Sequence, residues 1–113
     1  MPPEDKAVLM KTYRMFVENV QAEDILDRLQ QNQILKFSDR QEILSLSKNS
    51  ERMQMILEKI HHSKLSFGFK ALCDSIKFKY KKMYDVVMTI RKETYKHGVK
   101  DTVGMYINHF FLI

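Results

Sequence analysis

The stretch "ERMQMILEKIHHSKLSFGFKALCDSI", residues 51–76, decides the fold class of this chain. Apolar residues recur three and four positions apart on both sides of the polar segment "HHSK": Met53, Ile56, Leu57 and Ile60 before it, and Phe69, Leu72, Cys73 and Ile76 after it. This spacing places each set on one face of a helix. The stretch therefore predicts two amphipathic helices joined by a short connection, with Cys73 on a buried stripe.

The same periodicity continues on either side of this stretch. Further helices are predicted over about Glu4–Val20, Ala22–Asn32, residues 39–46, and Tyr80 to about Lys92. Strand-like alternation is scarce, and the first glycine in the chain is Gly68. The sequence thus predicts about six short helices that pack antiparallel or at steep angles around one core.

The connection before the third predicted helix is unusually apolar. We expect Ile34, Leu35 and Phe37 to plug the core, and Ser38 to cap the helix that follows. In that helix Ile43, Leu44 and Leu46 are expected to face inward.

Composition fits one domain without disulfides. The chain has 113 residues, of which 44% are hydrophobic and 29% charged, and it contains one cysteine. This length favours a single domain with a modest core. A lone cysteine cannot form an internal disulfide, and the chain opens without a charged-then-apolar leader, so we expect a reducing, cytoplasmic setting.

Charge is unevenly distributed along the chain. Residues 1–50 carry eight acids and seven bases, whereas residues 51–113 carry six acids and twelve bases. The whole net charge of +5 therefore lies in the second part. Such asymmetry favours a chain that meets an acidic partner or another copy of itself.

Three segments taken in order resemble a known family. "ILDRLQQNQILKFSDRQEIL", then "ERMQMILEKIHHSKLSFGFKALCDSI", then "KKMYDVV" resemble the caspase recruitment domain of the death-fold superfamily, over roughly residues 5–92. The family's G-x-x-A-F/L-x-x-S-L/I segment is matched by Gly68, Ala71, Leu72, Ser75 and Ile76. Tyr84 with Val87 is similar to the "L-Y-x-x-V" of the coiled-coil scaffold subgroup. The resemblance implies an all-α, six-helix antiparallel bundle of the Greek-key death-fold type.

The resemblance also implies a function. It implies a non-enzymatic interaction module for homotypic recruitment or oligomerisation in apoptotic or innate-immune signalling. The partner would be a caspase, adaptor or scaffold with such a domain, or a second copy of this chain. A basic residue often found in the middle of the family's first helix is replaced here by Tyr13, beside Lys11 and Arg14.

In the resembled family, two unlike surfaces on opposite sides of the bundle meet across neighbouring domains. The acidic surface would comprise Glu23, Asp24, Asp27, Asp39 and Glu42, and the basic surface Lys11, Arg14, Arg52 and Lys59. Because the two faces differ, repeated contacts extend as an array instead of closing a dimer. The alternative is that these charges are solvated faces with no partner.

A dense lysine run offers a different function. Lys77, Lys79, Lys81 and Lys82 alternate with Phe78 and Tyr80, as in proteins that grip phosphates and stack bases. The alternative hypothesis is therefore a small basic nucleic-acid-binding domain. We favour a solvated helix junction in which one or both aromatics plug the core, then an acidic protein partner, and nucleic acid or an anionic membrane last.

Catalytic and cofactor sites are not indicated. Cys73 lies on an apolar stripe, where a thiol is inert, although His61 and His62 are near in sequence. The four histidines, which include His97 and His109, lack the spacing of metal ligands, and there is no phosphate-binding glycine loop. We expect no enzyme activity, cofactor or metal.

The end of the chain lies outside the resemblance. We divide the chain into a bundle over residues 1–92 and an extension over residues 93–113. The apolar end "GVKDTVGMYINHFFLI" is too short for a membrane span, which needs about 20 apolar residues. We expect it either to dock on the bundle or to begin a following region.

Overall fold

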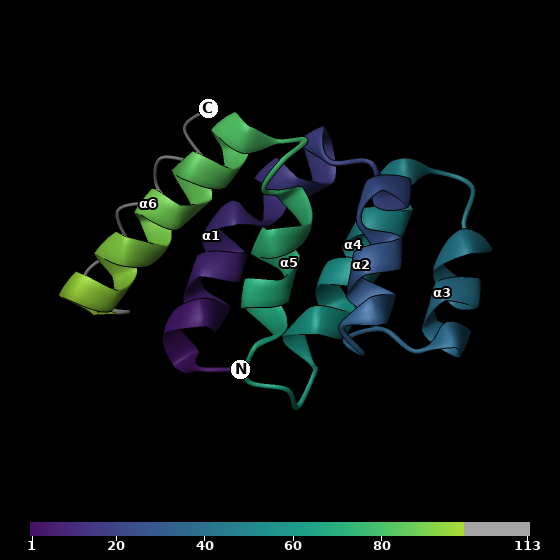
Figure 1. Ribbon diagram of the computed structural model, residues 1–113, viewed down its shortest axis with the longest axis horizontal. Coiled ribbons are helices and arrows are strands. Elements are labelled where there is room, and N and C mark those ends of the chain that lie inside the picture. The colour runs from purple at the N-terminus through teal and green to yellow at the C-terminus, as the bar shows by residue number, and fades with distance from the viewer. Residues whose placement is uncertain (99–113) are drawn as a thin grey trace.

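The computed structural model describes residues 1–98, and this part of the chain is helical without strands (Figure 1). Its elements are α1 (Pro3–Asn19), the 3₁₀ helix η1 (Ala22–Asp24), α2 (Leu26–Gln31), α3 (Phe37–Leu44), α4 (Asn49–His61), α5 (Gly68–Ile76) and α6 (Lys81–His97). The prediction of six α-helices is confirmed for these residues.

The helices form a bundle in which α5 is seen between α1 and the pair α2 and α4 in the view of Figure 1, while α1 also packs directly against α4. Helix α6 covers the outer side of α1, and α3 forms the opposite edge of the bundle, where it contacts α2 and α4. The edge position leaves α3 with fewer helices to pack against than α1, α4 or α5.

The predicted apolar stripes form the core. The positions predicted in α4 and α5, Met53, Ile56, Leu57, Ile60, Phe69, Leu72, Cys73 and Ile76, are all buried, as are Val8, Phe16, Ile25, Leu29, Val87 and Ile90. Tyr80, Met83 and Tyr84 pack against this core while partly exposed. Burial of such side chains supplies the main driving force for folding.

The second predicted helix is divided in two. Val20 is extended, and the chain then forms η1 and α2 instead of one helix from Ala22. The side chain of Asn49 at the start of α4 holds this turn: its amide donates to the Val20 carbonyl at 2.9 Å, and its oxygen accepts from the Ala22 N–H at 2.8 Å. A bond between residues so distant in sequence leaves no local sequence pattern.

The connection from α2 to α3 is only partly as predicted. Gln33 adopts a positive φ of 62°, and the Ile34 N–H donates to the Leu29 carbonyl at 3.0 Å, which closes the end of α2. Ile34 and Leu35 are buried as expected. The prediction for Phe37 was wrong, because its side chain is 64% exposed.

Helix α3 begins before its predicted cap. Lys36, not Ser38, is the N-cap residue, and its backbone N–H donates to Asp39 Oδ2 at 2.8 Å. The carboxylate of Asp39 thus supplies one half of a capping box, which fixes the start of the helix two residues earlier than a Ser38 cap would. Leu44 was also assigned wrongly, because it is 41% exposed on this edge helix.

Helix α6 continues past its predicted end near Lys92 to His97. The added turn packs on α1, because Lys11 Nζ donates to Thr94 Oγ1 at 2.8 Å and both side chains are buried. Gly98 then ends the helix with a positive φ of 86°, a conformation that glycine adopts without strain. The predictions for the apolar end fall on residues 99–113, which lie outside the described residues.

Candidate interaction surfaces

The predicted acidic residues lie on η1, α2 and α3. Glu23 and the side chains of Asp27 and Glu42 are exposed, the latter two by 76% and 56%. The carboxylates of Asp24 and Asp39 are 17% and 25% exposed. Three of the five residues therefore present most of their side chain to solvent.

Asp24 is bound within the molecule by the start of α6. Its carboxylate accepts from Lys79 Nζ at 2.8 Å and from the Tyr80 hydroxyl at 2.5 Å. These two hydrogen bonds hold the pKa of Asp24 below its ordinary value of 3.8. The Tyr80 hydroxyl also accepts the Gln21 N–H at 3.1 Å, so this cluster ties η1 to the junction of α5 and α6.

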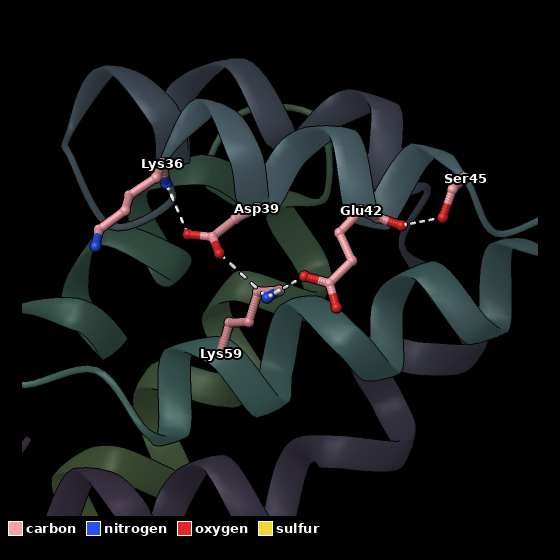
Figure 2. Close-up of polar contacts among 5 residues, drawn as sticks. All are labelled: Lys36, Asp39, Glu42, Ser45 and Lys59. Carbon is pink, nitrogen blue, oxygen red and sulfur yellow. Dashed lines mark hydrogen bonds and ion pairs between the residues drawn. The ribbon is translucent and has the colours of Figure 1, made fainter.

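Asp39 and Glu42 contact a residue that was assigned to the opposite surface. Lys59 Nζ on α4 lies 3.1 Å from Asp39 Oδ1 and 2.9 Å from Glu42 Oε2 (Figure 2). The placement of Lys59 on a separate basic surface was therefore wrong. Its charge is neutralised within the chain, and its bonds to Glu42 and Asp39 raise the pKa of Lys59 above 10.5.

Lys11 also does not lie on a basic surface. Its side chain is only 1% exposed and reaches Thr94 on α6. Burial lowers the pKa of Lys11, an effect that the nearby Glu93 partly opposes. The surface assignment of Lys11 was wrong because a lysine beside an apolar stripe can extend along the core instead of into water.

The two arginines predicted on the basic surface, Arg14 and Arg52, differ in their contacts within the chain. Arg14 is exposed and pairs with Glu18 one turn later in α1, at 2.6 Å. Arg52 Nε donates to the Leu46 carbonyl at 2.7 Å, and a second nitrogen reaches the Leu44 carbonyl at 3.3 Å. A cation that satisfies carbonyls at the end of α3 stabilises that helix, so Arg52 has a structural role.

An apolar pocket that the sequence reasoning missed lies between α1 and α4. Its volume is about 280 Å³, and it is lined by Leu9, Met10, Tyr13, Leu57, Glu58 and His61. Met10 is 66% exposed and Tyr13 38% exposed. Both residues flank the buried stripe of α1. This flanking position was the one feature of the sequence that could have indicated the pocket.

The lysine run lies at the junction of α5 and α6. Lys77, Lys81 and Lys82 are exposed, and Phe78 is 80% exposed, so only Tyr80 packs against the core. Lys79 and Tyr80 are engaged by Asp24. A second, larger hollow of about 640 Å³ adjoins this run, with Met15 and Met83 among its lining residues.

Cys73 is buried as predicted. Burial raises the pKa of its thiol to about 12, so it is protonated at neutral pH. His61 and His62 stack edge to face against each other, with ring centroids 5.1 Å apart. In residues 1–98, no three His, Cys, Asp or Glu side chains group closely enough to hold a metal ion.

The capping carboxylate of Asp39 should make stability depend on acid pH. The Lys36 N–H, and next Lys59, hold the pKa of Asp39 below 3.8, so its contribution is present above that value and is lost as pH falls through the lower folded pKa. Asp39→Asn should cost about 1 to 2 kcal/mol at pH 7. Urea unfolding should show this difference shrinking below about pH 4. An equal cost at every pH would contradict it, and Glu51→Gln, at an exposed site in the first turn of α4, is the control.

None of the helices in the described part of the chain combines the length and apolar character needed to cross a bilayer. Searches of curated proteins and of solved structures found no match.

The family comparison agrees with this geometry. The model of the family described as "CARD: Caspase recruitment domain" matches residues 6–89, which is most of the chain and spans the bundle from α1 into α6. The predicted death-fold helical bundle is thereby confirmed. This chain belongs to the caspase recruitment domain family.

Proposed function

We propose that this chain recruits other caspase recruitment domains, including its own copies, to assemble complexes in apoptotic or innate-immune signalling. The observation that carries this proposal is the family match over residues 6–89, because domains of this family are homotypic interaction modules. The partner would be a caspase, adaptor or scaffold in the cytoplasm. The buried, protonated Cys73 supports a role without catalysis.

We further propose that the contact is heterologous and that charge steers it. The acidic side would be formed by the exposed residues Glu23, Asp27 and Glu42, and the basic side by Arg14 on α1. Within the chain Asp27 pairs with Arg40, Glu42 with Lys59 and Arg14 with Glu18, so the contact would have to compete with these exposed pairs. Exposed charges raise the association rate more than they raise affinity. Each such pair contributes about 0 to 1 kcal/mol, so charge alone adds little to the affinity.

Protein recruitment is better supported than binding of nucleic acid. A single-strand binder needs free lysines and aromatic faces for stacking. In the lysine run, Lys79 and Tyr80 are bound to Asp24, which leaves Phe78, 80% exposed, as the one ring of the run that could stack on a base.

Charge reversal tests the steering contact. Asp27→Lys with Glu42→Lys reverses two of the three charges on the acidic side, and Arg14→Glu reverses the charge on the basic side. Either change should weaken self-association about tenfold at low salt, because like charges would then face each other. Light scattering measures the association, and circular dichroism checks that the helices persist.

Mixing the variants with the unmodified chain makes the test directional. Each variant keeps one intact surface, so it should add to a growing assembly and stop growth at that end. Lys70→Glu, at an exposed site on α5, is the matched control and should have no such effect. If both reversed variants assemble normally, the acidic-to-basic contact is wrong.

A further inference from the structure

The junction of α5 and α6 forms a basic surface. Residues 75–84 contain four lysines and no acidic residue. Lys79 pairs with Asp24, whereas the other three lysines are exposed and form no ion pair within residues 1–98: Lys77, Lys81 and Lys82. The first turn of α6 also lacks an acid, so the positive end of the helix dipole adds to their charge. Such a surface attracts an anionic partner.

Apolar side chains lie among these lysines. Phe78 is 80% exposed and Val86 is 46% exposed. The hollow of about 640 Å³ beside the junction joins both kinds of residue, because its lining includes Lys79, Lys81 and Lys82 together with Met15, Met83 and Val86. The surface therefore presents cations next to apolar groups, and its partner should combine negative charge with apolar groups in the same way.

An anionic lipid membrane has this combination. We infer that the α5–α6 junction binds the surface of an anionic phospholipid bilayer, with Phe78 inserted at the headgroup boundary and the lysines beside the phosphates. Aromatic and aliphatic side chains enter this boundary, while the ammonium groups of lysines remain at the level of the headgroups. The inference goes beyond the recruitment of other domains and does not depend on it.

Two other anionic partners fit this surface less well. Nucleic acid supplies phosphates, but proteins hold single strands with rings that stack on the bases. Phe78 is the one ring of the run available for stacking, and the side chains of Val86 and Met15 cannot stack. An acidic protein would need a formed pocket for Phe78, whereas a bilayer accommodates a protruding apolar side chain by rearrangement of its lipids.

Binding of a single chain should be weak and reversible. A lysine near an anionic membrane strengthens binding about fivefold, so the three lysines without an ion pair in the described residues together contribute about 100-fold. Lys79 adds less, because Asp24 binds it and the charge of Glu23 also acts on it. The attraction should decline between low and physiological salt, since salt screens exposed charges.

Charge reversal in the first turn of α6 tests the lysines. Lys81→Glu with Lys82→Glu should lower the affinity for vesicles of phosphatidylcholine with about 30% phosphatidylserine at least about 25-fold at low salt, as measured by co-sedimentation. The fold should persist, because acids near the start of a helix are favourable.

Lys64→Glu with Lys70→Glu is the matched control for this reversal. It changes the net charge equally on exposed residues at the other end of α5, about 12 Å away along a helix of nine residues. This control should bind within about threefold of the unmodified chain, because the distance exceeds the range of an exposed charge at physiological salt. An equal loss in both variants would indicate attraction by net charge alone and overturn the inference.

Substitution of Phe78 tests the insertion. Phe78→Ala should weaken vesicle binding about tenfold, because the ring no longer buries apolar area at the interface. Phe67→Ala is the matched control, since Phe67 is 46% exposed at the other end of α5 and should bind like the unmodified chain. If Phe78→Ala also binds like the unmodified chain, charge alone holds the protein and the inference is overturned.

A tryptophan at position 78 reports the contact without weakening it. The chain contains no tryptophan, so Phe78→Trp would be its single source of indole fluorescence. The emission should shift to the blue with anionic vesicles and be quenched by lipids brominated on their acyl chains, because an indole ring enters the membrane interface. Phe67→Trp should show neither change. Unchanged emission of Phe78→Trp would contradict the insertion.

Other ligands distinguish a membrane from a smaller or different anion. Vesicles of phosphatidylcholine alone should bind about 100-fold more weakly, and equal binding would overturn the inference. The soluble headgroup glycerophosphoserine should not displace the chain from anionic vesicles, and displacement would indicate a site for a small anion instead. Oligothymidylate at the same concentration of phosphate groups should bind more weakly than the vesicles, and tighter binding would identify a nucleic-acid surface. Each of these contrary results would leave the proposed recruitment of other caspase recruitment domains standing.

Discussion

The Cys73 thiol should react with a thiol reagent at least about 1,000-fold more slowly in the native protein than in the unfolded chain at pH 8. The thiolate is the reactive form, and burial raises the pKa of this group from 9.0 to about 12. At pH 8 that shift alone lowers the thiolate fraction by about three orders of magnitude. Because the side chain is 2% exposed, restricted access slows the reaction further.

The measurement is the labelling rate in buffer compared with the rate in concentrated denaturant. A chain with Lys70→Cys provides the control, because position 70 is exposed on the same helix and should label rapidly in the native state. Fast native labelling of Cys73 would contradict its burial, and with it the packing of α5.

The second large effect is expected at the junction of α1 and α6, where Arg91→Met should lower the free energy of unfolding by about 3 kcal/mol. The Asp5 side chain is only 3% exposed, and it accepts from Arg91 Nε at 2.9 Å. Loss of one partner leaves a buried carboxylate with too little compensation, at a cost of about 3 to 5 kcal/mol. The lower figure applies because Arg91 is 30% exposed, so water can replace part of its contribution.

Urea unfolding of the two chains measures this difference. Lys92→Met is the matched control, since residue 92 is exposed on the same helix and should change stability by about 0.5 kcal/mol or less. An equally small change for Arg91→Met would mean that the Asp5–Arg91 pair does not stabilise the packing of α6 on α1.

The fold could be predicted from sequence because it depends on local periodicity. Apolar residues at helical spacing predicted the buried faces of α1, α4, α5 and α6, and the order of those segments predicted the family. The division between η1 and α2 could not be predicted, because it depends on the Asn49 side chain bonding to Val20 and Ala22.

The charged surfaces were harder to predict than the core. Sequence spacing places a charge on a helix face but does not reveal which neighbouring helix that face meets. Lys59 faces α3, where it neutralises two acids, and Lys11 faces α6, where it is buried. Tertiary contacts therefore keep both side chains away from the surface to which they were assigned.

The exposure of Phe37 was missed for a related reason. Phe37 is apolar like a core residue, but it lies on the edge helix α3, where its side chain stays 64% exposed. An apolar residue at an edge is exposed in the monomer and available for association.

A concentration series of the full chain by light scattering at low salt tests whether copies of the chain assemble through two unlike surfaces. If the chain is a homotypic module with two unlike surfaces, its average mass should rise continuously with concentration and pass beyond that of a dimer. A mass that stays at 13.5 kDa up to the highest concentration, and that is unchanged when other caspase recruitment domains are added, would contradict homotypic recruitment by this chain.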